Sequence, residues 1–153
     1  MDRQFYINRA RSSLRVPIGA DLVLHEKPNP AEIIRDGKAL GHVVEETARL
    51  YRTPLAFAHM DLQLEKAVLL ETLGVPPEDV PLYHFSHDPG PDAVARAAAG
   101  LERPLHPALR AHIDSVGYIA RETDLVPIGM TIGPFSLMTK LLKDPITPIY
   151  LAG

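Results

Sequence analysis

Cysteine is absent from the 153 residues of this chain. Within these residues there is consequently no disulfide framework, no thiolate nucleophile and no cysteine-ligated metal. Long apolar runs are also missing, since none approaches the roughly 20 residues of a membrane-spanning helix. Residues 1–5 (MDRQF) lack the apolar segment of a secretory signal. We therefore expect a cytoplasmic protein that has no membrane partner.

An excess of charge of one sign is missing as well. Lys and Arg number 16 and Asp and Glu number 19, which gives a formal net charge of −3. This balance argues against nucleic acid as a partner. Hydrophobic residues make up 46% and charged residues 23% of the chain, as is typical of a globular protein. A chain of 153 residues is normally one domain with room for a core.

Proline is frequent, with 15 residues, and it marks the boundaries of alternating strands and helices. We predict strands at 16–20, 54–59, 80–85 and 125–132, and helices at 30–51, 62–73, 93–99, 104–123 and 135–142. Gly37 and Gly41 lie inside the first helix and indicate either close packing or a break near Asp36. Residues 1–15 read as a basic lead-in, and 146–152 as a last element. The alternation predicts an α/β fold with about four parallel strands and right-handed crossovers.

Residues 54–66 (PLAFAHMDLQLEK) are the segment from which the rest of the chain is interpreted. A short apolar run bounded by Pro54 is typical of a strand buried on both faces. His59 and Asp61 follow this run. They lie at the carboxyl end of the strand, where the active sites of barrels and doubly wound sheets form. Asp61 is expected to cap the next helix, and we favour an additional substrate contact because such loops often carry function. His59 and Asp61 could orient each other for proton transfer, so both are candidate catalytic residues.

The loop at residues 84–88 (HFSHD) follows another predicted strand. Its two histidines and one aspartate could ligate zinc. We favour a polar strand-end loop or a proton-transfer histidine, because the spacing is not an established ligand motif. His84 is therefore a candidate for substrate binding.

The turn at residues 131–136 (TIGPFS) lies where the last predicted strand leads into a helix. It matches neither the dinucleotide fingerprint nor the P-loop. Its backbone N–H groups and hydroxyls could bind an anion at the start of the helix, or the turn could serve close helix–strand packing. Thr131, Gly133 and Phe135 are candidate substrate-binding residues.

Taken together, segments 56–62 (AFAHMDL), 73–74 (LG), 126–129 (VPIG) and 133–142 (GPFSLMTKLL) resemble the uroporphyrinogen decarboxylase family. That family includes corrinoid-dependent methyltransferases, such as the methylcobamide:coenzyme M enzymes. Residues 15–17 (RVP) resemble its first-strand entry. The resemblance implies a TIM (β/α)8 barrel that acts on a tetrapyrrole or a corrinoid-linked substrate, by decarboxylation or methyl transfer. It also implies that Asp61 matches the active-site aspartate, which faces the pyrrole nitrogens in the decarboxylases.

Two departures bear on the branch of the family. The decarboxylases carry an arginine-rich segment after the first strand, and residues 19–26 (GADLVLHE) contain no arginine. A tyrosine of the decarboxylases aligns with Lys140. Both departures favour the methyltransferase-like branch. The zinc ligands of that branch belong to the second half of the barrel, so no metal or other cofactor is assigned to this chain, although zinc and a corrinoid could serve a full-length parent.

The resemblance covers most of the chain but only the first half of the family's barrel. A closed barrel needs roughly 250 residues. We therefore expect residues 1–153 to be the N-terminal half of a barrel domain, a truncated fragment of an enzyme. Two other hypotheses stay open. One is a catalytically inactive half-barrel that associates with itself or another chain through exposed strand edges, and the other is an unrelated small α/β binding domain.

Overall fold

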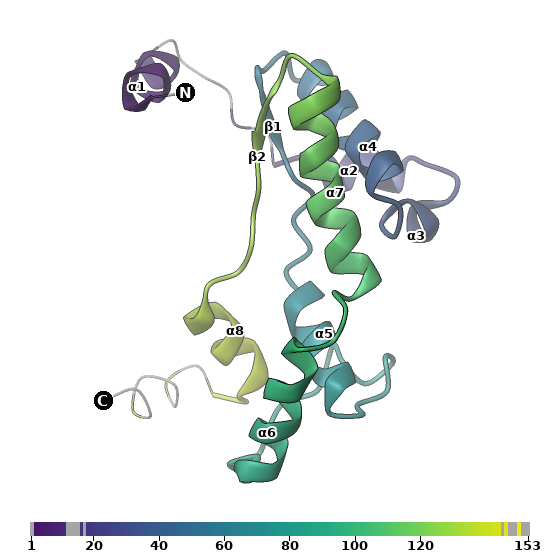
Figure 1. The fold of residues 1–153 in the computed structure, drawn as a ribbon, viewed down its shortest axis with the longest axis vertical. Helices are drawn as coiled ribbons and strands as arrows, with labels where there is room; N and C mark the ends of the chain where they lie inside the picture. Colours follow the sequence, from purple (N-terminus) through teal and green to yellow (C-terminus); the bar gives the residue numbers. More distant parts are fainter. Residues whose placement is uncertain (1, 12–15, 17, 145, 147–149, 151–153) are drawn as a thin grey trace. The chain divides into compact units, whose positions relative to one another are not determined.

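The computed structural model describes residues 2–11, 16, 18–144, 146 and 150. The chain divides into two compact units. Unit 1 consists of Met1–Met60 and Arg110–Met130, and unit 2 consists of Asp61–Leu109 and Thr131–Gly153. Figure 1 shows the elements along the chain. Each unit is described by itself.

Unit 1 holds most of the helices and both strands. Its elements are α1 (Arg3–Arg11), α2 (Ala20–His25), α3 (Pro30–Ile33), α4 (Gly37–Leu50), β1 (Leu55–Phe57), the greater part of α7 (Pro107–Glu122) and β2 (Val126–Ile128). β1 and β2 pair in parallel, with Leu55 opposite Val126 and Phe57 opposite Ile128. The ladder continues beyond β1, because the backbone N–H of Ala58 donates to the carbonyl of Ile128 at 2.9 Å. The described residues therefore form a mixed α/β fold that is rich in helix, with one sheet of two parallel strands.

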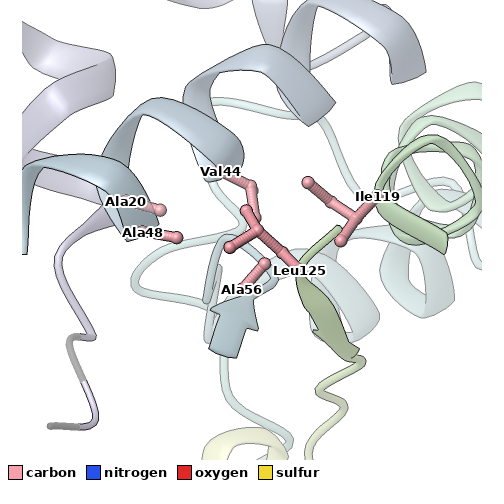
Figure 2. Close-up of a cluster of buried hydrophobic side chains, with 6 residues drawn as sticks. All are labelled: Ala20, Val44, Ala48, Ala56, Ile119 and Leu125. Atoms are coloured by element: carbon pink, nitrogen blue, oxygen red, sulfur yellow. The ribbon is translucent and has the colours of Figure 1, made fainter. Parts of the chain in front are cut away.

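The core of unit 1 lies where α2, α4 and α7 meet the strands (Figure 2). It is made by Ala20, Val44, Ala48, Ala56, Ile119 and Leu125, with Tyr118 packed against it. Three of the six are alanines, which allow the backbones to approach closely. A second cluster of unit 1 consists of Val23, Leu24 and Val43, and burial of the apolar surface of both clusters stabilises the unit.

Unit 2 consists of α5 (Leu64–Thr72), α6 (Gly90–Leu101), the first residues of α7 and α8 (Pro134–Leu141). Its core is centred on Leu70, Val80 and Leu141. α5 contacts both α6 and α8. Here Gly100 of α6 lies so close to Thr72 of α5 that a Cβ on the glycine would approach Thr72 Cγ2 to 2.7 Å.

Two predicted strands are not formed. Val16, Ile18 and Gly19 are not in a strand and Ala20 already begins α2, while Pro17 lies outside the described residues. In α2, residues Ala20, Val23 and Leu24 are buried at helical spacing, so burial selects a helix that the sequence pattern did not indicate.

The predicted strand at 80–85 is a turn with one bridge. The N–H of Tyr83 donates to the carbonyl of Asp79 at 2.9 Å, which closes a helical type of turn. Phe85 makes a single parallel bridge with Leu142. Pro81 has no N–H to donate to a ladder, which weakens a strand there.

The other boundaries differ from the prediction by a few residues. The helix predicted at 30–51 is broken into α3 and α4, because Asp36 takes an extended backbone and its side chain accepts a hydrogen bond from the N–H of Ala39 at 2.8 Å. The two strands that are formed have three residues each. Of the element predicted at 146–152, only residues 146 and 150 are described.

Candidate functional site

His59 lies directly beyond the end of β1, two residues after Phe57, and its side chain is 7% exposed. Its Nε2 lies 3.3 Å from Oδ1 of Asp21, and its Nδ1 lies 3.4 Å from Nε2 of His112. Asp21 belongs to the first turn of α2 and His112 to α7. Three elements of unit 1 therefore bring Asp21, His59 and His112 together, and we call these residues the histidine cluster.

The donor and acceptor roles in the cluster depend on the tautomers of the two imidazoles, and the chemistry of the partners assigns them as follows. A carboxylate only accepts, so Nε2 of His59 donates to Asp21. Nδ1 of a neutral His59 is then the acceptor, and Nε2 of His112 donates to it. In this assignment His112, His59 and Asp21 form one chain of hydrogen bonds, with the imidazole of His59 in the middle.

Sequence reasoning identified His59 and missed its two partners. The partner Asp21 lies on a helix that the sequence pattern did not reveal, 38 residues away along the chain. His112 lies 53 residues away, on a helix whose buried residues are Ala111, Ser115 and Ile119. A histidine next to that buried face was the one signal that could have pointed to His112.

Asp61 has a different environment. One of its carboxylate oxygens accepts a hydrogen bond from the N–H of Gln63 at 2.8 Å, in a turn that precedes α5. The capping position of α5 is Gln63, which makes no side-chain capping bond. The prediction that Asp61 caps the helix was therefore wrong by two residues, although its side chain does satisfy a backbone N–H at the entrance to α5. His59 and Asp61 belong to different units, and the partners of each lie within its own unit.

The 131–136 turn is held to α5 by Glu65. Oε1 of Glu65 accepts hydrogen bonds from Oγ1 of Thr131 at 2.8 Å and from the N–H of Ile132 at 3.1 Å. Oε2 of Glu65 is buried and has no hydrogen-bond partner among the described residues. Gly133 faces open space, and Phe135 is 52% exposed. Two of the donors that were expected to hold an anion are thus taken by a carboxylate of the chain itself.

The histidines of the 84–88 loop make local contacts. Nδ1 of His84 lies 2.8 Å from the carbonyl of Leu82, and Nδ1 of His87 lies 2.8 Å from the hydroxyl of Ser86. Asp88 accepts from the N–H of Gly90 at 2.8 Å. Across the described part of the chain, no group of three or more His, Cys, Asp or Glu side chains has an arrangement that could hold a metal ion.

Lys66 is an additional buried polar group that sequence reasoning did not single out. It is 2% exposed, and its Nζ donates to the carbonyl of Pro81 at 3.4 Å. Burial lowers the pKa of this ammonium group, and the charge of Lys140 lowers it further. A single long hydrogen bond is little compensation for a buried charge.

An open cleft of about 810 Å³ lies in unit 1, where the α3–α4 connection faces α7. Its lining includes Arg35, Lys38, His42, Tyr118 and Arg121. The hydroxyl of Tyr118 donates to Glu45 at 2.9 Å, which leaves it to accept from Nδ1 of His42 at 2.9 Å. Burial and the bond to Glu45 raise the pKa of Tyr118. The cleft lining carries charges of both signs, because Asp36, Asp114 and Glu122 also belong to it.

Comparison with protein-family models, with curated proteins and with solved structures found no match to this chain. Among the residues that are described, no helix is both long enough and apolar enough to cross a membrane.

Proposed function

We propose that this chain belongs to an enzyme of the uroporphyrinogen decarboxylase family, which acts on a tetrapyrrole or a corrinoid-linked substrate. The proposal rests on the resemblance of its motifs to that family. The observation that supports it in the structure is the histidine cluster, which places His59 at the carboxyl end of a parallel strand pair with Asp21 and His112 as partners. Active sites of parallel α/β folds form at that end of the strands.

Both reactions of the family require a proton to move. Decarboxylation replaces a carbon–carboxylate bond by a carbon–hydrogen bond, so a general acid must supply the proton. Methyl transfer to a thiol requires a base that removes the thiol proton. Imidazole suits either role, because its unperturbed pKa lies close to neutrality. In this proposal Asp21 orients His59, and the two histidines exchange the proton with the substrate.

In unit 2, considered by itself, Asp61 is the residue proposed as a polar anchor for a substrate. Its interaction with Gln63 engages one carboxylate oxygen, and a carboxylate can accept several hydrogen bonds. It could therefore accept from the pyrrole N–H groups of a tetrapyrrole. Thr131, Gly133, Phe135 and His84, which also belong to unit 2, remain proposed substrate-binding residues.

Equilibrium binding of two probes tests the proposal. Coproporphyrinogen, handled without oxygen, represents the tetrapyrrole substrates, and cobinamide represents the corrinoids. Asp61→Asn should weaken binding of the preferred probe by about tenfold, as expected for loss of one charge-assisted hydrogen bond. His59→Gln should leave binding of the probe in place, because this proposal gives His59 a role in proton transfer and none in binding.

Asp88→Asn is the matched control, because Asp88 accepts from the N–H two residues ahead at 2.8 Å in the same way as Asp61 does. This variant should bind as the wild type does. Preference for coproporphyrinogen would support the decarboxylase branch, and preference for cobinamide would support the methyltransferase branch. Failure of the wild type to bind either probe would overturn the proposal.

A second candidate function is association through the sheet. Within the described residues each strand pairs only with the other, and a sheet of two strands is marginally stable in water. A further strand from a second copy or another chain could complete it. Sedimentation velocity across a range of concentrations would show a dimer if copies pair, whereas a monomer at all concentrations would count against self-association.

A further inference from the structure

Glu65 determines which hydrogen-bonding groups the 131–136 turn can offer to a ligand. Its Oε1 accepts the hydroxyl proton of Thr131 and the N–H of Ile132, at 2.8 Å and 3.1 Å. All of these residues belong to unit 2. The turn has therefore lost two donors that an anion would need.

The hydroxyl of Thr131 is left with one hydrogen-bonding role toward a ligand. A hydroxyl carries one proton and two acceptor lone pairs. Because the proton points to Glu65, the oxygen of Thr131 can only accept a hydrogen bond from a ligand. The residue is exposed, so a ligand can reach it.

The negative charge of Glu65 also disfavours binding of an anion at the turn. The second oxygen of Glu65, Oε2, is buried and finds no partner in the part of the chain that is described. The carboxylate of Glu65 already accepts from Thr131 and Ile132, so a second anion there would meet both occupied donors and electrostatic repulsion.

We propose that the 131–136 turn binds an N–H donor group of a ligand and rejects carboxylates and phosphates, and that Glu65 sets this selectivity. Two sources share this chemistry: the pyrrole N–H of a tetrapyrrole and a primary ammonium group. The first source rests on the proposed function and deepens it, because the pyrrole nitrogens of the substrate, rather than its carboxylate side chains, would then lie at Thr131. The ammonium source is independent of it.

Amide chemical shifts of the ¹⁵N-labelled full chain test this selectivity. The probes are methylammonium chloride, sodium acetate and coproporphyrinogen, each titrated at constant ionic strength. In the wild type, methylammonium should shift the amides of Thr131, Ile132 and Gly133 saturably, and acetate should not. Glu65→Ala frees both donors and removes the charge, so acetate should then bind and methylammonium should not.

Two further variants separate selectivity from folding. Glu65→Gln keeps an acceptor for the N–H of Ile132 but loses the charge, so it should retain the turn and bind methylammonium about tenfold more weakly. Glu71→Gln removes a carboxylate from the same helix and should behave as the wild type. Saturable binding of acetate to the wild type, absence of a methylammonium response, or an unchanged preference in Glu65→Gln would each overturn the proposal.

The two proposals can fail separately. A methylammonium response that depends on Glu65, without any binding of coproporphyrinogen or cobinamide, would leave the selectivity of the turn standing and overturn the proposed function. Coproporphyrinogen binding that is equal in the wild type and in Glu65→Gln would remove the turn from the tetrapyrrole site and leave the proposed function intact.

Discussion

Oδ1 of Asp21 lies 3.3 Å from Nε2 of His59, although the two residues are 38 positions apart. The carboxylate is 59% exposed, and the imidazole is 7% exposed. The partly solvated carboxylate can therefore fix the tautomer of a buried ring at little cost in desolvation. His25 also contacts this carboxylate, with its Nδ1 3.4 Å from the same oxygen.

Removal of the carboxylate should change the tautomer of His59. In Asp21→Ala nothing holds the proton on Nε2, so the population with the proton on Nδ1 should rise. The ring nitrogen shifts of His59 in ¹⁵N-labelled protein measure this directly. Stability should fall by less than about 1 kcal/mol, because the acid is exposed. His25→Gln, which leaves the Asp21–His59 contact in place, should keep the wild-type tautomer, and an unchanged tautomer in Asp21→Ala would contradict this assignment.

Gly41 is predicted to be required where α4 meets α7. A Cβ on this residue would lie 2.6 Å from Cδ1 of Tyr118, inside the packed face. Gly41→Ala should therefore lower the free energy of unfolding by roughly 1–2 kcal/mol, because overpacking outweighs the better helix propensity of alanine. Chemical denaturation measures the change.

Gly117→Ala is the matched control for Gly41→Ala. Gly117 also lies in a helix of unit 1, but a Cβ there would meet the flexible end of Arg121, at 3.0 Å. The guanidinium can move away, so this variant should be as stable as the wild type or up to about 1 kcal/mol more stable. Equal destabilisation of both variants would argue against close packing as the cause.

Asp36 is the N-cap of α4, and its side chain should stabilise the protein by one capping hydrogen bond. Its carboxylate accepts from the N–H of Ala39 at 2.8 Å. Asp36→Ala should lower the free energy of unfolding by about 1 kcal/mol, whereas Asp36→Ser should restore most of it, because serine also caps well. Thermal or urea unfolding of the two variants makes the comparison, and equal stability of the alanine and serine variants would refute the capping role.

Lys66 should make the free energy of unfolding depend on pH in the alkaline range. Its pKa is lowered in the folded state from 10.5, mainly by burial and then by Lys140. Between the folded and the unfolded pKa, the unfolded chain binds more protons, so stability rises with pH through this window. Below the folded pKa, the full cost of burying the charge remains.

Lys66→Met should remove that cost. We expect its free energy of unfolding at neutral pH to be higher than that of the wild type by roughly 1–3 kcal/mol. The rise of wild-type stability with alkaline pH should be absent in this variant. Urea denaturation at several pH values between 7 and about 11 provides the measurement. Lys143→Met, at an exposed site of unit 2, is the control and should keep the wild-type pH dependence. A steeper pH dependence in Lys66→Met would exclude Lys66 as the source.

Local patterns in the sequence determined a large part of the secondary structure. The apolar run after Pro54 and the run at 125–132 predicted the only two strands that the described residues form, and their parallel pairing followed from the alternation. The helical periodicity after Pro30 predicted α4, and glycine and proline marked the beginning of α8. These features depend on residues a few positions apart, so the sequence shows them directly. The place of His59 directly after a strand was likewise predicted from the sequence.

Only the tertiary structure decided which side chains meet. The pairs His59–Asp21, His59–His112 and Glu65–Thr131 join residues 38, 53 and 66 positions apart. The first of these contacts depends on α2, which is a helix because three of its apolar residues are buried together. The segment at 80–85 shows the converse, since its apolar residues suit a strand, yet it packs on Leu70 and Leu141 as a turn. Hydrogen-bond partners at such separations are selected by the packed core, and no local pattern records them.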